Sequence, residues 1–193
     1  MEKTAIIIVD MLKDNVDTDS HFKMGEEARK IIPPIQRLLA FAREKGMPVI
    51  FANDSFLPDD FIFREGKGKP HSIIGTEGAK VIAEFGPEDS DIILPKRRFS
   101  AFWGTNLESM LREKEIDTIA VCGISTSVCV LASVLDGIAH DFRVLLMDDC
   151  CATFKPEHHT AVVNMYCSGA LYPLLQAMSL DDFLSAAEAG KYC

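Results

Sequence analysis

Three side chains that could together cleave a carbonyl compound stand far apart in this 193-residue chain: Asp10, Lys96 and Cys129. A thiolate is a strong nucleophile, and it needs a base to take its proton and a nearby cation. Asp10 could act as the base and Lys96 as the cation, which would also hold Asp10 ionised. Groups this close would titrate as one coupled set. If the fold brings them together, these residue types predict covalent catalysis by Cys129.

Cys129 belongs to a stretch, Gly123–Val130, in which a strand pattern gives way to a helix pattern. The apolar run 118–122 predicts a buried strand, a Gly/Ser/Thr turn follows, and a helix opens with Cys129 in its first turns. The positive end of a helix dipole favours thiolate, which predicts a lowered pKa for Cys129. Free N–H groups of the turn could form an oxyanion hole. The alternative is that Cys129 is a small core residue, because free cysteine is often buried.

The elements that must position these residues alternate between strand and helix. Continuous apolar runs predict strands buried on both faces, and ligands of open α/β sheets bind outside the carboxyl ends of the strands. The predicted strands are 4–9, 48–53, 91–94, 118–122, 142–147 and a weak one at 174–178. The charged residues at their ends are Asp10, Asp54, Lys96 and Asp148. Acid, amine and thiol are therefore expected at one edge of the sheet.

Helices are predicted between the strands, where apolar residues recur at spacings of three, four and seven. They cover about 34–46, 76–85, 105–115, 129–140, 156–168 and 180–189. This alternation predicts one α/β domain over residues 1–193, a three-layer α/β/α fold with a doubly wound, mostly parallel six-stranded sheet. Residues 55–75 have no periodicity and several Gly and Pro, as expected of a functional loop such as an active-site lid.

Composition excludes several classes of protein. The chain is 48% hydrophobic and 25% charged, as ordinary globular proteins are. Its net charge of -9 argues against nucleic acid and anionic membranes as partners. No apolar run reaches the roughly 20 residues needed to span a bilayer, and the N-terminus lacks the features of a signal peptide. Six cysteines without a C-x-x-C pair indicate reduced thiols and a cytoplasmic protein.

Four motifs occur in a characteristic order along nearly the whole chain. They are Ile8-Val9-Asp10, the His-x-x-x-Gly-Thr-x-Gly stretch 71–78, the Lys-x-x-x-Ser-Ala-Phe stretch 96–102 and the Gly-Ile-Ser-Thr-x-x-Cys-Val stretch 123–130. Together they resemble the isochorismatase-like cysteine hydrolases, which include nicotinamidase/pyrazinamidase and N-carbamoylsarcosine amidase. Each motif alone is moderately informative, whereas the ordered set is specific.

The resemblance implies a catalytic triad of Asp10, Lys96 and Cys129. It also implies a cis peptide bond between Ile124 and Ser125, with the N–H groups of Ser125 and Cys129 forming the oxyanion hole. The implied reaction is hydrolysis of an amide or carbamoyl group through a thioester, with release of ammonia. Because isochorismatases proper carry no cysteine nucleophile at this position, Cys129 favours an amidase.

The resemblance is incomplete at the metal site of nicotinamidases, which use Asp-x-His and a later His. Here Phe56 stands where the first His belongs, while Asp54 and His71 match. We therefore expect no metal or other cofactor, with Asp54, His71 and water holding a weak ion as the alternative. Phe56 would then form a pocket wall. Phe102 and Trp103 are further pocket candidates, and for Trp103 a core or subunit-interface role is favoured over substrate contact.

Two positions of the sequence argue against nicotinamide as the substrate. Asn15 and Gly68 stand where nicotinamidases place the aromatic residues that stack on pyridine, which lowers nicotinamide as a substrate. The stretch 53–55 is more similar to N-carbamoylsarcosine amidases, whose substrates carry a carboxylate. Arg64 is the candidate to bind such a group.

The leading hypothesis is a cysteine-dependent amidohydrolase acting on a small carboxamide or N-carbamoyl compound. The alternatives are a nicotinamidase/pyrazinamidase proper and a catalytically degenerate binding or scaffold protein. A flavodoxin-like nucleotide binder ranks last, because no Gly-rich phosphate loop follows the first strand. Apart from the small-molecule amide, the expected partner is a second copy of the chain, since the family commonly forms homodimers or homotetramers.

Overall fold

Six parallel strands form the centre of the protein, as seen in a computed structural model that describes residues 3–17, 24–66, 69–169 and 171–192. The sheet order is β3-β2-β1-β4-β5-β6, and every neighbouring pair is parallel. The strands are β1 (Thr4–Val9), β2 (Val49–Asp54), β3 (Ile92–Lys96), β4 (Thr118–Ile124), β5 (Arg143–Ala152) and β6 (Leu175–Met178). The order reverses between β1 and β4, where open α/β sheets form their ligand sites.

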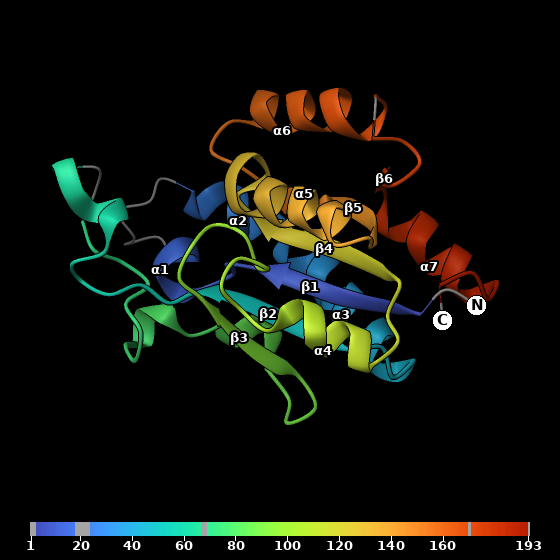
Figure 1. Cartoon of the computed structure of the whole chain (residues 1–193), viewed down its shortest axis with the longest axis horizontal. Coiled ribbons are helices and arrows are strands. Elements are labelled where there is room, and N and C mark those ends of the chain that lie inside the picture. The colour runs from blue at the N-terminus through green and yellow to red at the C-terminus, as the bar shows by residue number, and fades with distance from the viewer. Residues whose placement is uncertain (1–2, 18–23, 67–68, 170, 193) are drawn as a thin grey trace.

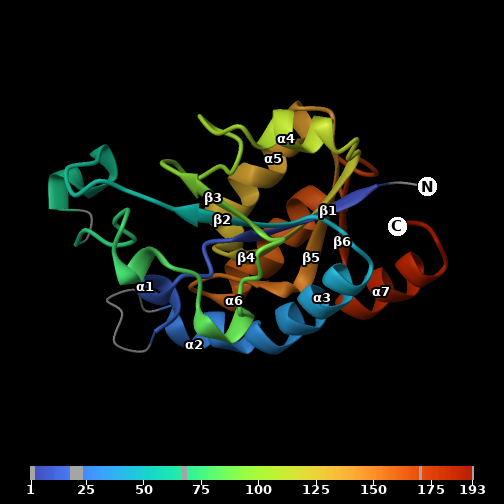
Figure 2. The ribbon, with the colours of Figure 1, turned by 90° about the horizontal axis from the view of Figure 1, so that it is seen from below.

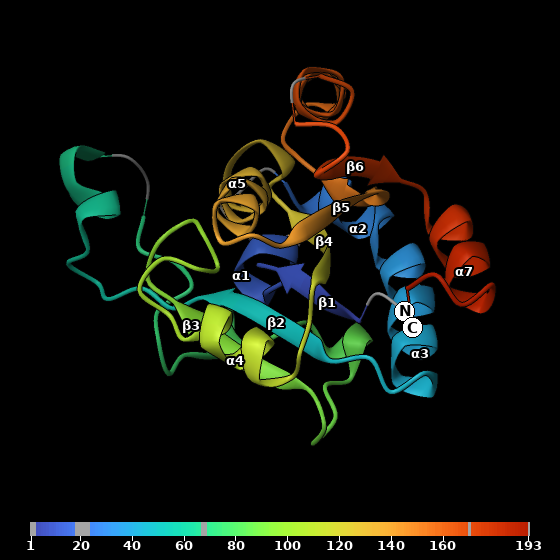
Figure 3. The same cartoon turned by 45° about the vertical axis from the view of Figure 1, so that its right-hand side comes forward.

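Helices cover both faces of the sheet, so the predicted three-layer α/β/α fold is confirmed (Figure 1). Figures 2 and 3 show α4 and α5 on one face and α3 and α7 on the other. The helices are α1 (Lys13–Val16), α2 (Gly25–Lys30), α3 (Ile32–Glu44), α4 (Leu107–Glu113), α5 (Leu131–Ala139), α6 (Pro156–Val162) and α7 (Leu180–Glu188). Within the described ranges, no helix combines the length and the apolar character needed to cross a bilayer.

The apolar pattern of the sequence explains the burial of the central strand and of one face of the helix that packs on it. All six residues of β1 are buried, because helices cover this central strand from both sides. On α3 the buried positions follow the helical repeat, and the proline pair at its start occupies the first turn, where a missing N–H costs no hydrogen bond. The buried side chains of this helix are Ile32, Ile35, Leu38, Leu39 and Ala42.

The long connection from β2 to β3 differs from its prediction. The helix expected over 76–85 is two short 3-10 turns, Glu77–Ala79 and Ala83–Phe85. The chain between them pairs with the segment after β1, through Lys13 N–H to the Lys80 carbonyl and Ile82 N–H to the Met11 carbonyl. Backbone groups used in this pairing cannot also close α-helical hydrogen bonds. The segment 55–75, which was expected to be a loop, contains the 3-10 helix Phe61–Gly66. This helix projects from the body of the protein at the left of Figure 1.

The end of β5 also differs, because the strand continues past Met147 to Ala152. A bulge makes this extension possible: Val121 pairs with Leu146, whereas Gly123 pairs with Cys151. Asp148 therefore lies inside the strand rather than at its carboxyl end. The predicted helix 156–168 is divided between α6 and a π-helical turn, Val163–Cys167.

Candidate active site

The carboxyl ends of four strands bring the candidate catalytic residues to one place. Asp10 follows β1, Asp54 ends β2, Lys96 ends β3, and Cys129 lies in the turn after β4. These strands are neighbours in the sheet, and their parallel register aligns their ends. Asp10, Lys96 and Cys129, which the sequence places more than 30 residues from one another, thus lie together at the point where the strand order reverses.

Two backbone positions allow β1 and β4 to meet closely at this edge. Gly123 has φ +106°, and a Cβ there would lie 2.2 Å from the Val9 carbonyl oxygen, so no other residue fits. Asp10 itself has φ 54°, in the left-handed region that side chains rarely adopt. The Asp10 N–H donates to the Ala52 carbonyl at 3.0 Å, and Asn15 Nδ2 donates to the Asp10 carbonyl at 2.9 Å. These bonds hold the backbone of Asp10 in this conformation.

A buried ion cluster forms the floor of the site. The ammonium of Lys96, which is fully buried, lies 2.8 Å from Asp10 Oδ2 and also contacts Asp54 Oδ1. Asp10 Oδ1 accepts a hydrogen bond from the Asp54 backbone N–H at 2.7 Å. One cation thus serves two carboxylates. Burial disfavours the charged amine, but the charges of Asp10 and Asp54 outweigh it and raise the pKa of Lys96, so this side chain stays an ammonium.

Asp54 is the carboxylate most affected by this crowding. Burial and the charge of Asp10 raise the pKa of Asp54 to about 7, against the opposing effect of Lys96. Near neutral pH this carboxyl group is therefore partly protonated. When Asp54 is protonated, Asp10 is the one negatively charged partner that Lys96 keeps in this cluster.

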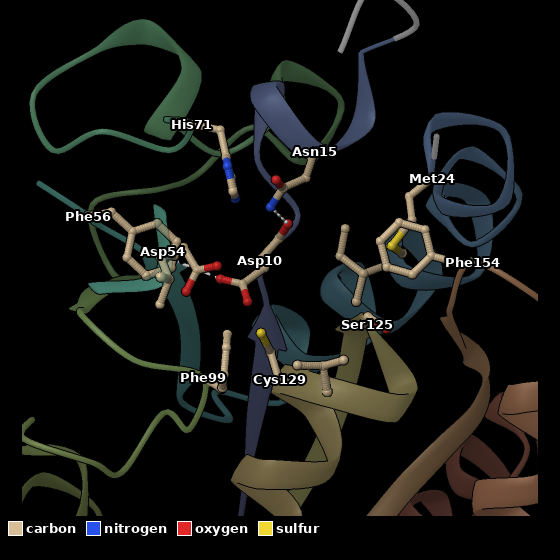
Figure 4. Close-up of a pocket in the computed structure, with 13 residues that line it drawn as sticks. Asp10, Asn15, Met24, Asp54, Phe56, His71, Phe99, Ser125, Cys129 and Phe154 are labelled. Carbon is tan, nitrogen blue, oxygen red and sulfur yellow. Dashed lines mark hydrogen bonds between the residues drawn. The ribbon is translucent and has the colours of Figure 1, made fainter. Parts of the chain in front are cut away.

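The Cys129 thiol points at the carboxylate of Asp10 (Figure 4). The acceptor atoms of Asp10, Asp54 and Cys129 all lie within 4.8 Å of one another. The predicted lowering of the Cys129 pKa is wrong: burial raises the pKa of Cys129, and the charge of Asp10 and the hydrogen bond to it act in the same direction. Lys96 opposes this shift without overcoming it. The resting group is a thiol positioned to give its proton to Asp10.

The turn that carries Cys129 is not the start of an α-helix. Cys129 lies in a π-helical turn, Thr126–Val130, directly before α5, so the predicted helix boundary is corrected. The peptide bond between Ile124 and Ser125 is cis, and the Ser125 carbonyl accepts hydrogen bonds from the N–H groups of Val128 and Val130 at 3.0 and 3.1 Å. The turn thus folds back over its first carbonyl group, with Ser125 and Cys129 both facing the cavity.

Side-chain hydrogen bonds support this turn from behind. The hydroxyl of Ser125 lies 2.6 Å from that of Thr153, which in turn lies 2.9 Å from that of Ser127. The fully buried Thr126 hydroxyl bonds to His159 of α6. Thr153, directly after β5, and His159 of α6 therefore hold the turn through polar contacts.

A cavity of about 270 Å³ opens above the ion cluster (Figure 4). Its floor is polar, and its walls are mainly apolar. The lining residues are Asp10, Asn15, Met24, Asp54, Phe56, Ile62, His71, Phe99, Ile124, Ser125, Val128, Cys129 and Phe154. Phe99 and Val128 stand inside the sequence motifs and could have been nominated from them. Met24, Ile62 and Phe154 carry no signal in the sequence, because loops and distant elements bring them here.

Of the four pocket residues predicted, only Phe56 lines the cavity. Arg64 is exposed on the projecting 3-10 helix and is not among the lining residues. Phe102 packs in the core, with its ring 5.3 Å from that of His140. Trp103 is 59% exposed, and the guanidinium carbon of Arg98 lies 5.6 Å from its ring centre. Neither Phe102 nor Trp103 is therefore a wall of this cavity.

The residues present do not fit the metal site that the resemblance would imply. The ring of Phe56 lies 5.7 Å from that of His71, where a second imidazole would otherwise stand. The His71 Nδ1 lies 3.1 Å from the Lys69 carbonyl oxygen, and the Asp54 carboxylate is paired with Lys96. The ligand set of one Asp and two His is thus reduced to Asp54 and His71, and the carboxylate of Asp54 is already paired with an ammonium group.

A family profile described as the isochorismatase domain matches residues 4–172. The chain belongs to the isochorismatase family. It is a hydrolase, as the resemblance of its motifs implied. The fold is also that of the family, because solved structures of its members superpose on nearly the whole chain.

Comparisons of sequence and of structure identify similar members of this family. The isochorismatase family protein PncA of Bacillus subtilis is 31% identical over 172 residues, 85% of this chain and 94% of the relative. The solved structure named nicotinamidase/pyrazinamidase PncA from the same species is 30% identical, with a TM-score of 0.82, and covers 92% of this chain and 100% of that one. N-carbamoylsarcosine amidase of Thermoplasma acidophilum is 28% identical, with a TM-score of 0.79 and coverage of 93% and 97%.

Proposed function

We propose that the protein is a cysteine-dependent amidohydrolase that cleaves a small carboxamide or N-carbamoyl compound and releases ammonia. The observation that carries the proposal is the Cys129 thiol aimed at the buried Asp10 carboxylate, with Lys96 2.8 Å behind it. A nucleophile, its base and a cation that orients the base are the parts that thiol acylation requires. The amidases among its relatives support the same class of reaction.

In the first half of the proposed reaction, the Cys129 sulfur bonds to the substrate carbonyl carbon while the thiol proton passes to Asp10. The tetrahedral intermediate then loses its C–N bond, and Asp10 returns the proton to the departing nitrogen, which leaves as ammonia. Because burial keeps Cys129 protonated, attack and proton transfer are coupled rather than sequential. Lys96 keeps its charge throughout and stabilises Asp10 whenever that carboxylate is ionised.

In the second half, water attacks the thioester and gives its proton to Asp10. The C–S bond breaks, the sulfur recovers a proton, and the acid leaves. The N–H groups of Ser125 and Cys129 are the proposed donors to the oxyanion in both halves. This sequence needs no metal or other cofactor, in keeping with the pairing of Asp54 and Lys96.

Two alternatives make different use of the same pocket. A nicotinamidase proper is less well supported, because Asn15 hydrogen-bonds the Asp10 carbonyl where an aromatic ring would stack. Gly68, the second position of this kind, lies outside the described residues. A degenerate binding protein would have no need of a thiol buried against Asp10 and Lys96. A cytoplasmic location and assembly as a homodimer or homotetramer remain part of the proposal through the family resemblance.

The test is ammonia release from a panel of nicotinamide, pyrazinamide, aliphatic and aromatic amides and N-carbamoyl amino acids. The Cys129→Ala variant should release no ammonia above background and should keep its circular dichroism spectrum. Cys167→Ala is the matched control, because Cys167 is a buried thiol outside the site, and it should keep its activity. Turnover that survives in Cys129→Ala would refute the proposal.

A further inference from the structure

The reactive groups and the apolar residues occupy different parts of the cavity lining. Asp10, Asp54 and Cys129 gather at one place, with their reactive atoms all within 4.8 Å of one another. The rest of the lining is mainly apolar, with walls formed by Met24, Phe56, Ile62, Phe99, Val128 and Phe154. A substrate whose scissile group reaches Cys129 must place the rest of its body against these walls.

The cavity lining, as far as the structure describes it, offers no strongly basic side chain to pair with a second negative charge. No lysine or arginine belongs to the lining of the described chain, and its formal charges are the acids Asp10 and Asp54. Two polar wall side chains are already engaged with backbone: Asn15 with the Asp10 carbonyl and His71 with the Lys69 carbonyl. A substrate carboxylate would lose its hydration and lie near two other acids.

Three described cations near this edge of the sheet have partners of their own. Arg97 binds Asp60 with Nη2 at 2.6 Å and Nε at 3.1 Å. Arg98 also faces Asp60 and stacks on Trp103. Lys96 lies beneath the acids and is fully buried. These side chains are positioned by their own carboxylate and aromatic partners, not by an anion in the cavity.

We infer that the substrate is a primary carboxamide whose acyl group is uncharged and apolar, aliphatic or aromatic, and not a carboxylate-bearing amide or N-carbamoyl amino acid. This inference rests on the proposed amidohydrolase function. It also replaces Arg64 as a substrate-binding residue, since selectivity arises from the apolar walls and from a lining without lysine or arginine among the described residues. At about 270 Å³ the cavity is suited to a small acyl group.

Pairs of amides that differ by one carboxylate test the inference directly. Hexanamide is paired with adipamate, and benzamide with 4-carboxybenzamide, and ammonia release is measured at pH 8, where an ordinary imidazole is neutral. The uncharged member of each pair should have a kcat/KM about 100-fold higher, because its partner must bury an unpaired charge. The Cys129→Ala variant, titrated calorimetrically, should bind only the uncharged members.

A cation added to the wall should reverse part of this selectivity. Val128→Lys places an ammonium at the cavity, where Val128 is 38% exposed, and should raise kcat/KM for the carboxylate members about 10-fold. Leu135→Lys is the matched control, because Leu135 is 37% exposed on α5 and outside the cavity lining. It should leave both members of each pair unchanged.

Each outcome separates the inference from the function on which it rests. Faster turnover of adipamate or 4-carboxybenzamide by the unmodified enzyme would overturn the inference and leave the amidohydrolase in place. If no amide is cleaved, the proposed function fails. The calorimetric titration of Cys129→Ala then tests by itself whether the cavity prefers uncharged amides. Equal binding of both members of a pair to Cys129→Ala would then refute the inference.

Discussion

The imidazole of His159 lies with its Nδ1 3.0 Å from the fully buried hydroxyl of Thr126. Its Nε2 lies 2.9 Å from Asp148 Oδ1, so one ring connects β5 to the turn that follows β4. Thr126 is adjacent in sequence to Ser125, the proposed oxyanion donor. The contact therefore ties the orientation of this turn to a residue that does not line the cavity.

Replacing His159 should affect the reaction step more than substrate binding. We expect His159→Ala to lower kcat about 10-fold with little change in KM, because a loosened turn misplaces the donors to the transition state. Steady-state kinetics on a cleaved amide measures both constants. His158→Ala is the matched control on the same helix, since His158 is exposed, and it should behave like the unmodified enzyme. A rise in KM with unchanged kcat would contradict the predicted role.

Lys96 should be essential for stability as well as for activity. Lys96→Met leaves Asp10 and Asp54 buried without their cation, which should lower the free energy of unfolding by about 3–5 kcal/mol. Urea titration measures the loss. Adding Asp54→Asn to this variant should recover part of it, because one buried charge is then removed. Lys80→Met, which breaks an exposed pair with Glu77, should have no measurable effect.

The raised pKa of Asp54 predicts how stability varies with pH. Between pH 3.8, its ordinary pKa, and about 7, the folded chain keeps a proton on Asp54 that the unfolded chain has released. The free energy of unfolding contributed by this group therefore falls as pH rises through that window, by about 1 kcal/mol per pH unit. Asp54→Asn cannot titrate and should show a correspondingly flatter slope in urea titrations from pH 4 to 7. Identical slopes would mean that Asp54 titrates normally in the folded chain.

Gly123 should tolerate no side chain. Gly123→Ala combines an unfavourable φ of +106° with a Cβ 2.2 Å from the Val9 carbonyl oxygen, so it should cost about 3 kcal/mol or more and abolish activity. Thermal unfolding and ammonia release measure the two effects. Gly46→Ala isolates the effect of backbone conformation, because Gly46 has φ +67° with no atom within 4 Å of a Cβ, and it should cost only about 1 kcal/mol. Similar losses at both positions would rule out the steric explanation.

Strand ends were the most predictable part of the site. The apolar runs before Asp10, Asp54 and Lys96 are local and are bounded by charged residues, so strand and end can both be read from neighbouring residues. Parallel packing then brings such ends together whatever the intervening loops do. The meeting of Asp10, Lys96 and Cys129 follows from this regularity.

The cavity walls were far less predictable. Phe56 was expected and lines the cavity, whereas Arg64, Phe102 and Trp103 do not. All three lie in connections between strands and helices. The course of such connections depends on contacts with distant segments, as where the backbone hydrogen bond from Lys13 to Lys80 forms in place of a predicted helix. Local periodicity carries no information about such pairings.

The sequence by itself determined the family, the parallel α/β sheet and the reactive groups delivered to its edge, because these depend on short-range patterns and ordered motifs. Only the tertiary structure decided the protonation of Cys129, which burial and Asp10 keep as a thiol, contrary to the helix-dipole expectation. It also decided the apolar walls and the support of Thr126 by His159. Desolvation and side-chain contacts are set by residues far apart in the chain, and they exist only once the chain has folded.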